Sequence, residues 1–217
     1  MRSRVWTLLL AVGVALATLA LVPRLAQLRL PGDHSGYEPD QPIEYSHRLH
    51  AGELGIECQY CHSGAGRSRY AGIPSASVCM NCHQFITAPR SAIRAEELAA
   101  EDEGRAPVKV VSAELEKLYT ALALDRQLEP DPALEPQPIR WARVHQLPDF
   151  VYFDHRPHVA AGLQCQKCHG PIETMERVRQ VESLSMGWCI SCHRDPHGRG
   201  GMAGNPTAST DCVTCHY

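Results

Sequence analysis

The chain has few aromatic residues, no excess of basic residues and no cysteine outside one recurring motif. Aromatic residues make up 6 % of its 217 residues, against 16 glycines and 16 prolines, so a core built mainly from large protein side chains is not expected. Lys and Arg total 21 and Asp and Glu total 24. Without a basic stripe, nucleic-acid binding is excluded. Strand signals are almost absent, which argues against a β-sheet fold.

The cysteines are the most informative feature. All ten lie in five copies of Cys-x-x-Cys-His, numbered here in chain order: Cys58/Cys61/His62, Cys79/Cys82/His83, Cys165/Cys168/His169, Cys189/Cys192/His193 and Cys212/Cys215/His216. This motif attaches haem c: both thiols form thioethers with the porphyrin, and the histidine is the proximal iron ligand. A zinc site needs no histidine directly after the second cysteine, and a disulfide framework is disfavoured because no cysteine lies outside the motifs. The sequence therefore predicts five covalently bound haem c groups.

Five haems in so short a chain constrain the fold. Roughly 40 residues are available for each motif, too few for five separate protein cores. The haems must then supply much of the buried apolar surface and pack against one another. We expect a mainly α and irregular fold, in which short helices and loops surround the cofactors.

The amino terminus contains a long apolar run. Residues 5–22 carry no charge, with Arg4 before them and Arg24 after them. As a helix, this run is about 27 Å long, enough to cross a bilayer core. A cleaved signal peptide has a shorter apolar region and a small-residue cleavage site, whereas this run ends in Val22-Pro23-Arg24. We expect a single transmembrane anchor at residues 1–23. Because haem c is attached outside the cytoplasm, the remainder is expected on the periplasmic side of the bacterial cytoplasmic membrane.

The remainder contains an internal repeat. Tyr45-Ser46-His47-Arg48-Leu49-His50 precedes the first motif, and Phe153-Asp154-His155-Arg156-Pro157-His158 precedes the third. Both blocks have the same order: an aromatic residue, then x-His-x-x-His, then two motifs. This order indicates duplication of a two-haem unit. We predict a first two-haem module at 24–88, a haem-free spacer at 89–140 and a three-haem module at 141–217.

The spacer has two segments with helical patterns. These are residues 92–100 and 112–125, the second with Ser112 as its N-cap. One interpretation is a helix that docks onto a partner protein, and the other is a helix packed on its own domain. The Pro-rich residues 129–138 are expected to be extended.

Each iron also needs a sixth ligand, unless it stays open for a substrate. The pairs His47/His50 and His155/His158 have a spacing of three, so both rings of a pair lie on one side of a turn and can reach two different haems. With His145 they make five, one for each iron. We predict these five histidines as distal ligands, with Met186 or His197 as replacements for His145. Five six-coordinate irons indicate electron transfer, not catalysis.

Two resemblances extend this interpretation. The blocks resemble class III and c7-like multihaem cytochromes c. The order of the whole chain, with WARVHQLPDFVYFDHRPHVAAGLQCQKCHG at 141–170 and SMGWCISCHR at 185–194, is similar to the pentahaem cytochrome c of bacterial alternative complex III. That family implies a membrane complex that oxidises menaquinol and passes electrons to a soluble or membrane-bound acceptor. It also implies partners, namely iron–sulfur or other cytochrome subunits together with an integral subunit that binds quinol.

Two other functions are weighed against an electron relay. A self-sufficient, membrane-anchored quinol dehydrogenase typically has a methionine shortly after its first motif, but His62 is followed here by Ser63-Gly64-Ala65-Gly66-Arg67. A multihaem reductase of small oxyanions needs an open iron, often with lysine as the proximal ligand, and all five motifs end in histidine. The relay is therefore the favoured prediction.

Overall fold

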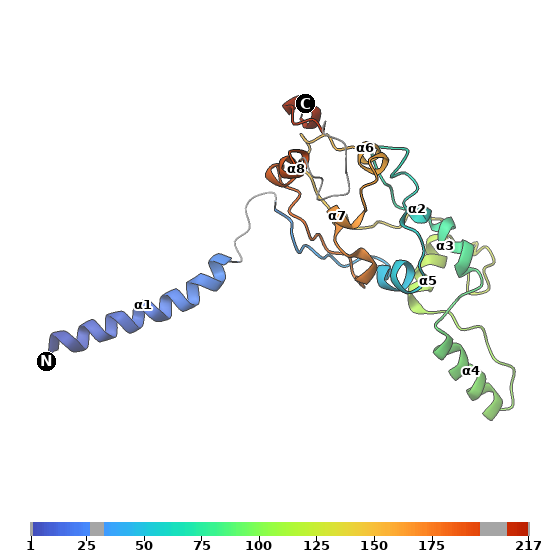
Figure 1. Ribbon diagram of the computed structural model, residues 1–217. Coiled ribbons are helices and arrows are strands. Elements are labelled where there is room, and N and C mark those ends of the chain that lie inside the picture. Colours follow the sequence, from blue (N-terminus) through green and yellow to red (C-terminus); the bar gives the residue numbers. More distant parts are fainter. Residues whose placement is uncertain (1, 27–32, 196–207, 217) are drawn as a thin grey trace. The chain divides into compact units, whose positions relative to one another are not determined.

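The computed structural model describes residues 2–26, 33–195 and 208–216. Within these ranges the secondary structure consists of helices, and the only β-type pairings are two isolated bridges, Leu124 with Pro130 and Val151 with His216. The expectation of a mainly helical and irregular fold is therefore confirmed for the described part (Figure 1). The chain divides into two units, residues 1–34 and residues 35–217.

The first unit contains helix α1, Arg2–Ala26. It covers the segment that the sequence predicts as a transmembrane anchor. In the described part of the chain, however, no helix has both the length and the apolar character that a membrane span requires.

The second unit carries the five motifs, each on a short helix. Both cysteines lie on one helical turn because residues three apart share a face, with Cys165 at the N-cap of its helix. The histidine follows at or just beyond the helix end. Ser185 caps the fourth of these helices by accepting a hydrogen bond from Trp188 N at 3.3 Å. The motif helices are α2 Cys58–Cys61, α3 Ala76–His83, α7 Gln166–His169, α8 Met186–His193 and α9 Cys212–Cys215.

The two x-His-x-x-His segments also form single turns. In the first block, His47 precedes the π-helical turn η1, Arg48–Glu53, which packs on the 3₁₀ turn η2, Ile172–Thr174. In the second block the segment opens helix α6, His155–Ala160, whose N-cap Asp154 accepts a hydrogen bond from Arg156 N. The duplicated sequence thus takes two different helical forms.

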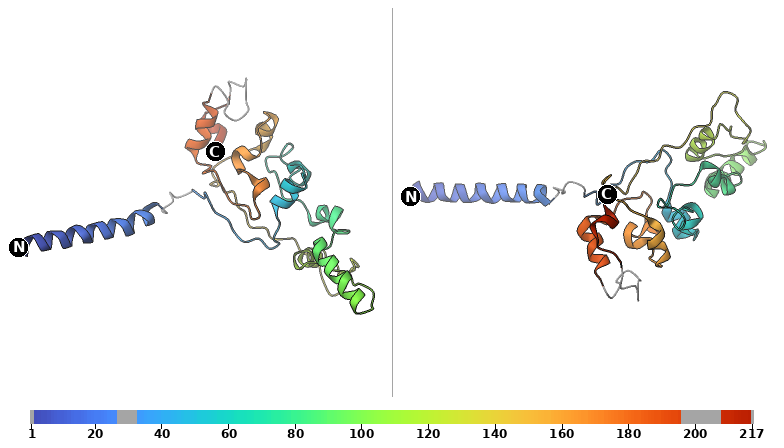
Figure 2. Two further views of the ribbon diagram at one scale, coloured as in Figure 1. Left: turned by 60° about the horizontal axis from the view of Figure 1, so that its bottom comes forward. Right: turned by 90° about the horizontal axis from the view of Figure 1, so that it is seen from above.

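The spacer provides half of the buried apolar residues of the described chain, namely Ala100, Leu118, Tyr119 and Ala123. Helix α4 is Arg90–Asp102 and helix α5 is Ala113–Ala121. Leu118 and Tyr119 of α5 are buried, and the Tyr119 hydroxyl donates to the carbonyl of His83 at 2.6 Å. Of the two interpretations of this segment, α5 therefore agrees with a helix packed on its own domain. Figure 2 shows α4 at the opposite end of this unit from α8.

Candidate haem-binding site

Histidine rings from the two blocks face the motif histidines in pairs. The His47 and His62 rings are parallel within 3°, with centroids 6.4 Å apart. His155 and His169 repeat this arrangement, again at 3° and 6.4 Å. The first histidine of each block thus faces the histidine of the motif that directly follows it.

The second histidine of each block faces the next motif along the chain. His50 and His83 have centroids 6.1 Å apart with planes tilted by 60°. His158 and His193 also lie 6.1 Å apart, with a tilt of 42°. Four ring pairs therefore combine the four x-His-x-x-His histidines with the first four motif histidines.

These separations fit one metal ion between each pair of rings. With metal–nitrogen bonds of about 2 Å, two imidazoles on opposite sides of one ion have centroids about 6.3 Å apart. Most of these rings also use Nδ1 to donate to a backbone carbonyl, which leaves Nε2 free as a ligand. The acceptors and distances are Ser46 (2.9 Å) for His50, Gly72 (2.6 Å) for His62, Ile86 (2.9 Å) for His83, Arg69 (2.8 Å) for His155, Asp154 (2.8 Å) for His158 and Ser209 (2.7 Å) for His193.

The aromatic residue that begins each block separates its two histidines. Tyr45 is edge-on to His47, at 4.9 Å and 83°, and stacks on His50, at 4.3 Å and 25°. Phe153 has the same relation to its own pair, at 86° to His155 and 32° to His158, with 4.8 Å to each ring. The aromatic ring therefore fixes the two imidazoles in different orientations, which lets one turn serve two sites.

Burial keeps several of these imidazoles neutral, as an iron ligand must be. The pKa of His47 falls to about 4, first through burial and then through His62 and His50. Burial, followed by the nearby His145, His155 and His62, lowers the pKa of His169 to about 3. Burial also lowers the pKa of His158. Their ring lone pairs are thus available at pH 7.

Neighbouring motifs follow one another in space in an order that differs from the sequence. Burial raises the pKa of several thiols, and in each case a cysteine of another motif adds to the effect. These neighbours are Cys82 for Cys61, Cys61 for Cys79, Cys58 for Cys165, Cys192 for Cys168 and Cys215 for Cys189. The motifs therefore form the series second, first, third, fourth, fifth, and Figures 1 and 2 show helices α3, α2, α7, α8 and α9 in that order.

The protein alone does not bury the motif helices. The structure describes every residue of these five helices, and none of these residues is buried. Large apolar side chains in or beside the motifs are exposed, among them Phe85 at 78 % and Val213 at 86 %. The apolar faces of porphyrins would cover such side chains, so the surface fits the cofactor that the motifs predict.

Arg69 connects the two blocks and also fits an anionic cofactor. Its carbonyl accepts hydrogen bonds from both N and Nδ1 of His155. Its guanidinium lies over the rings of Tyr152 and Tyr70, at 4.2 and 4.8 Å, and its Nε is buried without a hydrogen-bond partner. A half-buried cation with a buried, unused donor suits an acidic group such as a haem propionate.

The fifth motif differs from the other four. Among the described residues, the ring that neighbours His216 is Phe150, at 5.7 Å and 30°. His145, predicted as the fifth distal ligand, instead contacts His169, and its Nε2 is 3.2 Å from His169 Nδ1. The assignment of His145 to the fifth iron stays a prediction, and this position does not favour it. Met186 is 64 % exposed, and His197 lies outside the described residues.

Sequence reasoning did not find the supporting residues Arg69, Gln41 and Gln180. Gln180 is fully buried, and its Oε1 accepts from Gln146 N at 3.3 Å. Gln41 forms two hydrogen bonds with the backbone of Ala142, both at 2.9 Å. These contacts join residues far apart in the chain, so no local sequence pattern predicts them.

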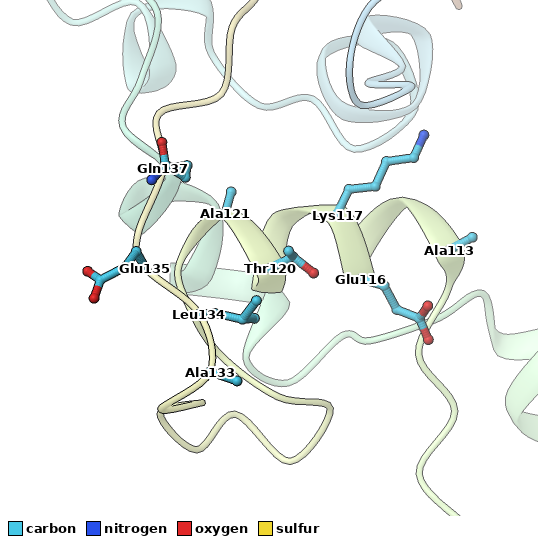
Figure 3. A pocket seen from close by; sticks show the side chains of 9 residues that line it. All are labelled: Ala113, Glu116, Lys117, Thr120, Ala121, Ala133, Leu134, Glu135 and Gln137. Carbon is cyan, nitrogen blue, oxygen red and sulfur yellow. The ribbon is translucent and has the colours of Figure 1, made fainter.

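A solvent-open hollow of about 700 Å³ lies in the spacer, away from the histidine pairs. It lies between α5 and residues 133–137, where Lys117 and Glu116 point from the helix and Leu134 faces Thr120 (Figure 3). It contains no motif residue and belongs to the spacer, not to the site.

Comparison with known proteins agrees with this geometry. Residues 151–217 match the family described as cytochrome c7 and related cytochrome c. The chain is also 22 % identical over 199 residues to a protein of Nitratidesulfovibrio vulgaris (strain Hildenborough) named menaquinone reductase, multiheme cytochrome c subunit. The alignment covers 82 % of this chain and 78 % of that protein. The carboxy-terminal third of the chain is therefore a cytochrome c7-like multihaem domain.

Proposed function

We propose that this chain is a pentahaem cytochrome c that relays electrons within a membrane-bound, quinone-linked oxidoreductase. The observation that carries the proposal is the set of four opposed imidazole pairs at 6.1–6.4 Å. Such pairs suit six-coordinate irons, which exchange electrons but have no position left for a substrate.

The pairs define the ligands of four irons. His47 and His62 serve the first, His50 and His83 the second, His155 and His169 the third, and His158 and His193 the fourth. The fifth iron takes His216 as its proximal ligand, with Met186 or His197 as candidates for the sixth position. Ten thioether bonds from the motif cysteines hold the five haems.

The protein sets where the haem sites lie and in which order they follow one another. Haem c, when bound, supplies an iron that accepts and donates one electron at a time. The chain's own residues hold neighbouring sites close together, because one turn carries the distal histidines of two successive motifs. The series from the second to the fifth motif provides one path with two ends, as a relay between two partners requires.

The proposed partners follow from the resemblance and from the relative's name. The relative is named as part of a menaquinone reductase, and the resemblance to alternative complex III implies integral quinol-binding and iron–sulfur subunits. We place the haem-bearing part on the outer side of the bacterial cytoplasmic membrane, where haem c is attached. No catalytic residue is assigned to this chain.

Purification of the native complex tests this function. A menaquinol analogue should reduce the haems of this chain in the complex, but not in the isolated holoprotein. Reduction of the isolated holoprotein at the same rate would favour a self-sufficient quinol dehydrogenase instead.

The reductase alternative depends on the fifth site, where no histidine faces His216 among the described residues. A high-spin signal from the wild-type protein, together with nitrite-dependent reoxidation, would favour that alternative. Low-spin spectra for all five haems would support the relay.

A further inference from the structure

His169 differs from the other motif histidines in the group that accepts its Nδ1 hydrogen. His62, His83 and His193 each donate to a backbone carbonyl, at 2.6–2.9 Å. His169 has the ring nitrogen Nε2 of His145 in this position, at 3.2 Å. The two rings meet edge to face, with centroids 4.3 Å apart and planes at 82°. One proximal position is thus supported by an imidazole where three others use a peptide oxygen.

The segment that carries His145 is fixed on both sides. On one side, Gln41 holds Ala142 by two hydrogen bonds: its Nε2 donates to the Ala142 carbonyl, and its Oε1 accepts from Ala142 N. On the other, Gln146 N donates to the buried Gln180. The adjacent Val144 is buried as well. A side chain on such a segment cannot move far without breaking part-buried hydrogen bonds, so its contact with His169 is built into the fold.

The roles of the two nitrogens follow from the ligand geometry. Nε2 of His169 must stay unprotonated to bind iron, so its Nδ1 carries the hydrogen. The neighbouring Nε2 of His145 must then be the acceptor. A nitrogen whose lone pair accepts this hydrogen bond cannot also bind a metal ion.

We propose that His145 is a positioning residue for His169, not an iron ligand. It accepts the Nδ1 hydrogen, holds the ring parallel to His155 and makes His169 a more basic proximal ligand than the carbonyl-bonded ones. Outer-shell acceptors of this kind raise ligand basicity and tune the metal. A more basic ligand stabilises ferric iron, so the third haem has a lower potential than it would have with a carbonyl acceptor. This inference rests on the proposed role of His169 as an iron ligand.

The test compares His145→Ala, His145→Gln and the control Gln146→Ala as full-length holoproteins. All three should retain five haems and entirely low-spin spectra. In His145→Ala, one haem should shift to a higher midpoint potential with altered g-values in electron paramagnetic resonance. In His145→Gln, whose amide oxygen can accept the same hydrogen, the shift should be smaller. Gln146→Ala should match the wild type.

Two results would overturn the proposal. A new high-spin haem in either His145 variant would show that His145 is a distal ligand. Unchanged haem potentials in both variants would show that His145 does not influence His169. If His145→Ala does not form a holoprotein, the spectra and potentials of His145→Gln still test the proposal. A complex that fails to oxidise quinol would contradict the proposed function but leave these spectra unchanged, so the two failures are distinguishable.

Discussion

The distal histidines can be tested one at a time. His155→Ala removes the ring that faces His169 at 6.4 Å, while all ten cysteines remain to attach haem. We expect one haem to become high-spin with no loss of haem content, as measured by absorption spectra and by the mass of the denatured chain. The change Met186→Leu alters a 64 % exposed side chain and, with His197 as the sixth ligand of the fifth iron, should leave all spectra unchanged. Loss of a methionine–iron absorption band in that control would assign Met186 to the fifth iron.

Gly170 is required at the end of the third motif for two separate reasons. Its φ of +74° is strained for any residue with a side chain, and an added Cβ would lie 2.5 Å from Val181 Cγ2. We expect Gly170→Ala to lower the free energy of unfolding by more than about 2 kcal/mol, since backbone strain and overpacking add. Gly55 has a similar φ of +66° with nothing within 4 Å, so Gly55→Ala isolates the backbone effect. Equal losses of stability in denaturant titrations would contradict the role of Val181.

At the residue scale, the sequence predicts which residues can bind haem better than it predicts where those residues lie in the fold. The spacing of Cys-x-x-Cys-His identifies which residues can bind haem, because the attachment geometry is local. The x-His-x-x-His pairs are predictable for the same reason. His145 shows the limit. Matching the number of histidines to five irons predicts that it is a ligand, but its contact with His169 depends on hydrogen bonds that its segment makes with Gln41 and Gln180, which are distant in sequence.

Helix α5 supports the second motif through one hydrogen bond. The buried Tyr119 donates its hydroxyl to the carbonyl of His83. Tyr119→Phe should leave that carbonyl without its partner and destabilise the fold by about 1 kcal/mol. Tyr60→Phe is the matched control: Tyr60 accepts a hydrogen bond from Asn81 but is 51 % exposed, so water can replace the bond. Unfolding free energies of the two holoproteins check the difference, and a larger loss in Tyr60→Phe would contradict it.

A pH-sensitive contact joins helix α4 to the loop that follows it. Glu96 binds Arg105 and also accepts from Val108 N at 2.9 Å. The Arg105 hydrogen bond, followed by that from Val108, lowers the pKa of Glu96 to about 2. A lowered pKa means that the contact stabilises the loop above the ordinary glutamate pKa of about 4.3 and is lost as pH falls towards 2. The amide shift of Val108 should therefore titrate with a midpoint near 2, and Glu96→Gln should abolish this titration. A midpoint near 4 would contradict it.

At the element scale, helix existence is predicted well and helix ends less well. The sequence predicts helices at residues 92–100 and 112–125, and α4 and α5 occupy both segments. Ser112 caps α5 as predicted, accepting from Leu115 N. The helix ends at Ala121 and not at 125, because Ala123 adopts a φ of +56° and the chain turns back so that Asp131 N donates to the Ala123 carbonyl. That return also pairs Leu124 with Pro130 in an isolated bridge, which helical periodicity does not predict.

At the scale of the whole molecule, duplication is visible in the sequence but the interlocking of the copies is not. The repeated His-x-x-His blocks predict two similar two-haem units, and the ring pairs at 6.4 Å and 3° in both units agree with that repeat. Arg69 of the first block holds His155 of the second, and Cys58 lies beside Cys165. The first and third motifs are therefore adjacent, and the second motif becomes an end of the series. Only the packing of distant segments sets this order.

The spatial order of the haems gives a prediction for a matched pair of variants. His50→Ala opens the iron of the second motif, at one end of the series, and His155→Ala opens the iron of the third, near the middle. Each variant should gain one high-spin haem, which then reports on its paramagnetic neighbours. The third site has a neighbour on either side, through Cys58 and through Cys192. Its high-spin signal should therefore relax faster and be broader in electron paramagnetic resonance than that of the second site. Equal linewidths, or a broader signal in His50→Ala, would contradict the order second, first, third, fourth, fifth, and with it the position of the two ends through which electrons enter and leave.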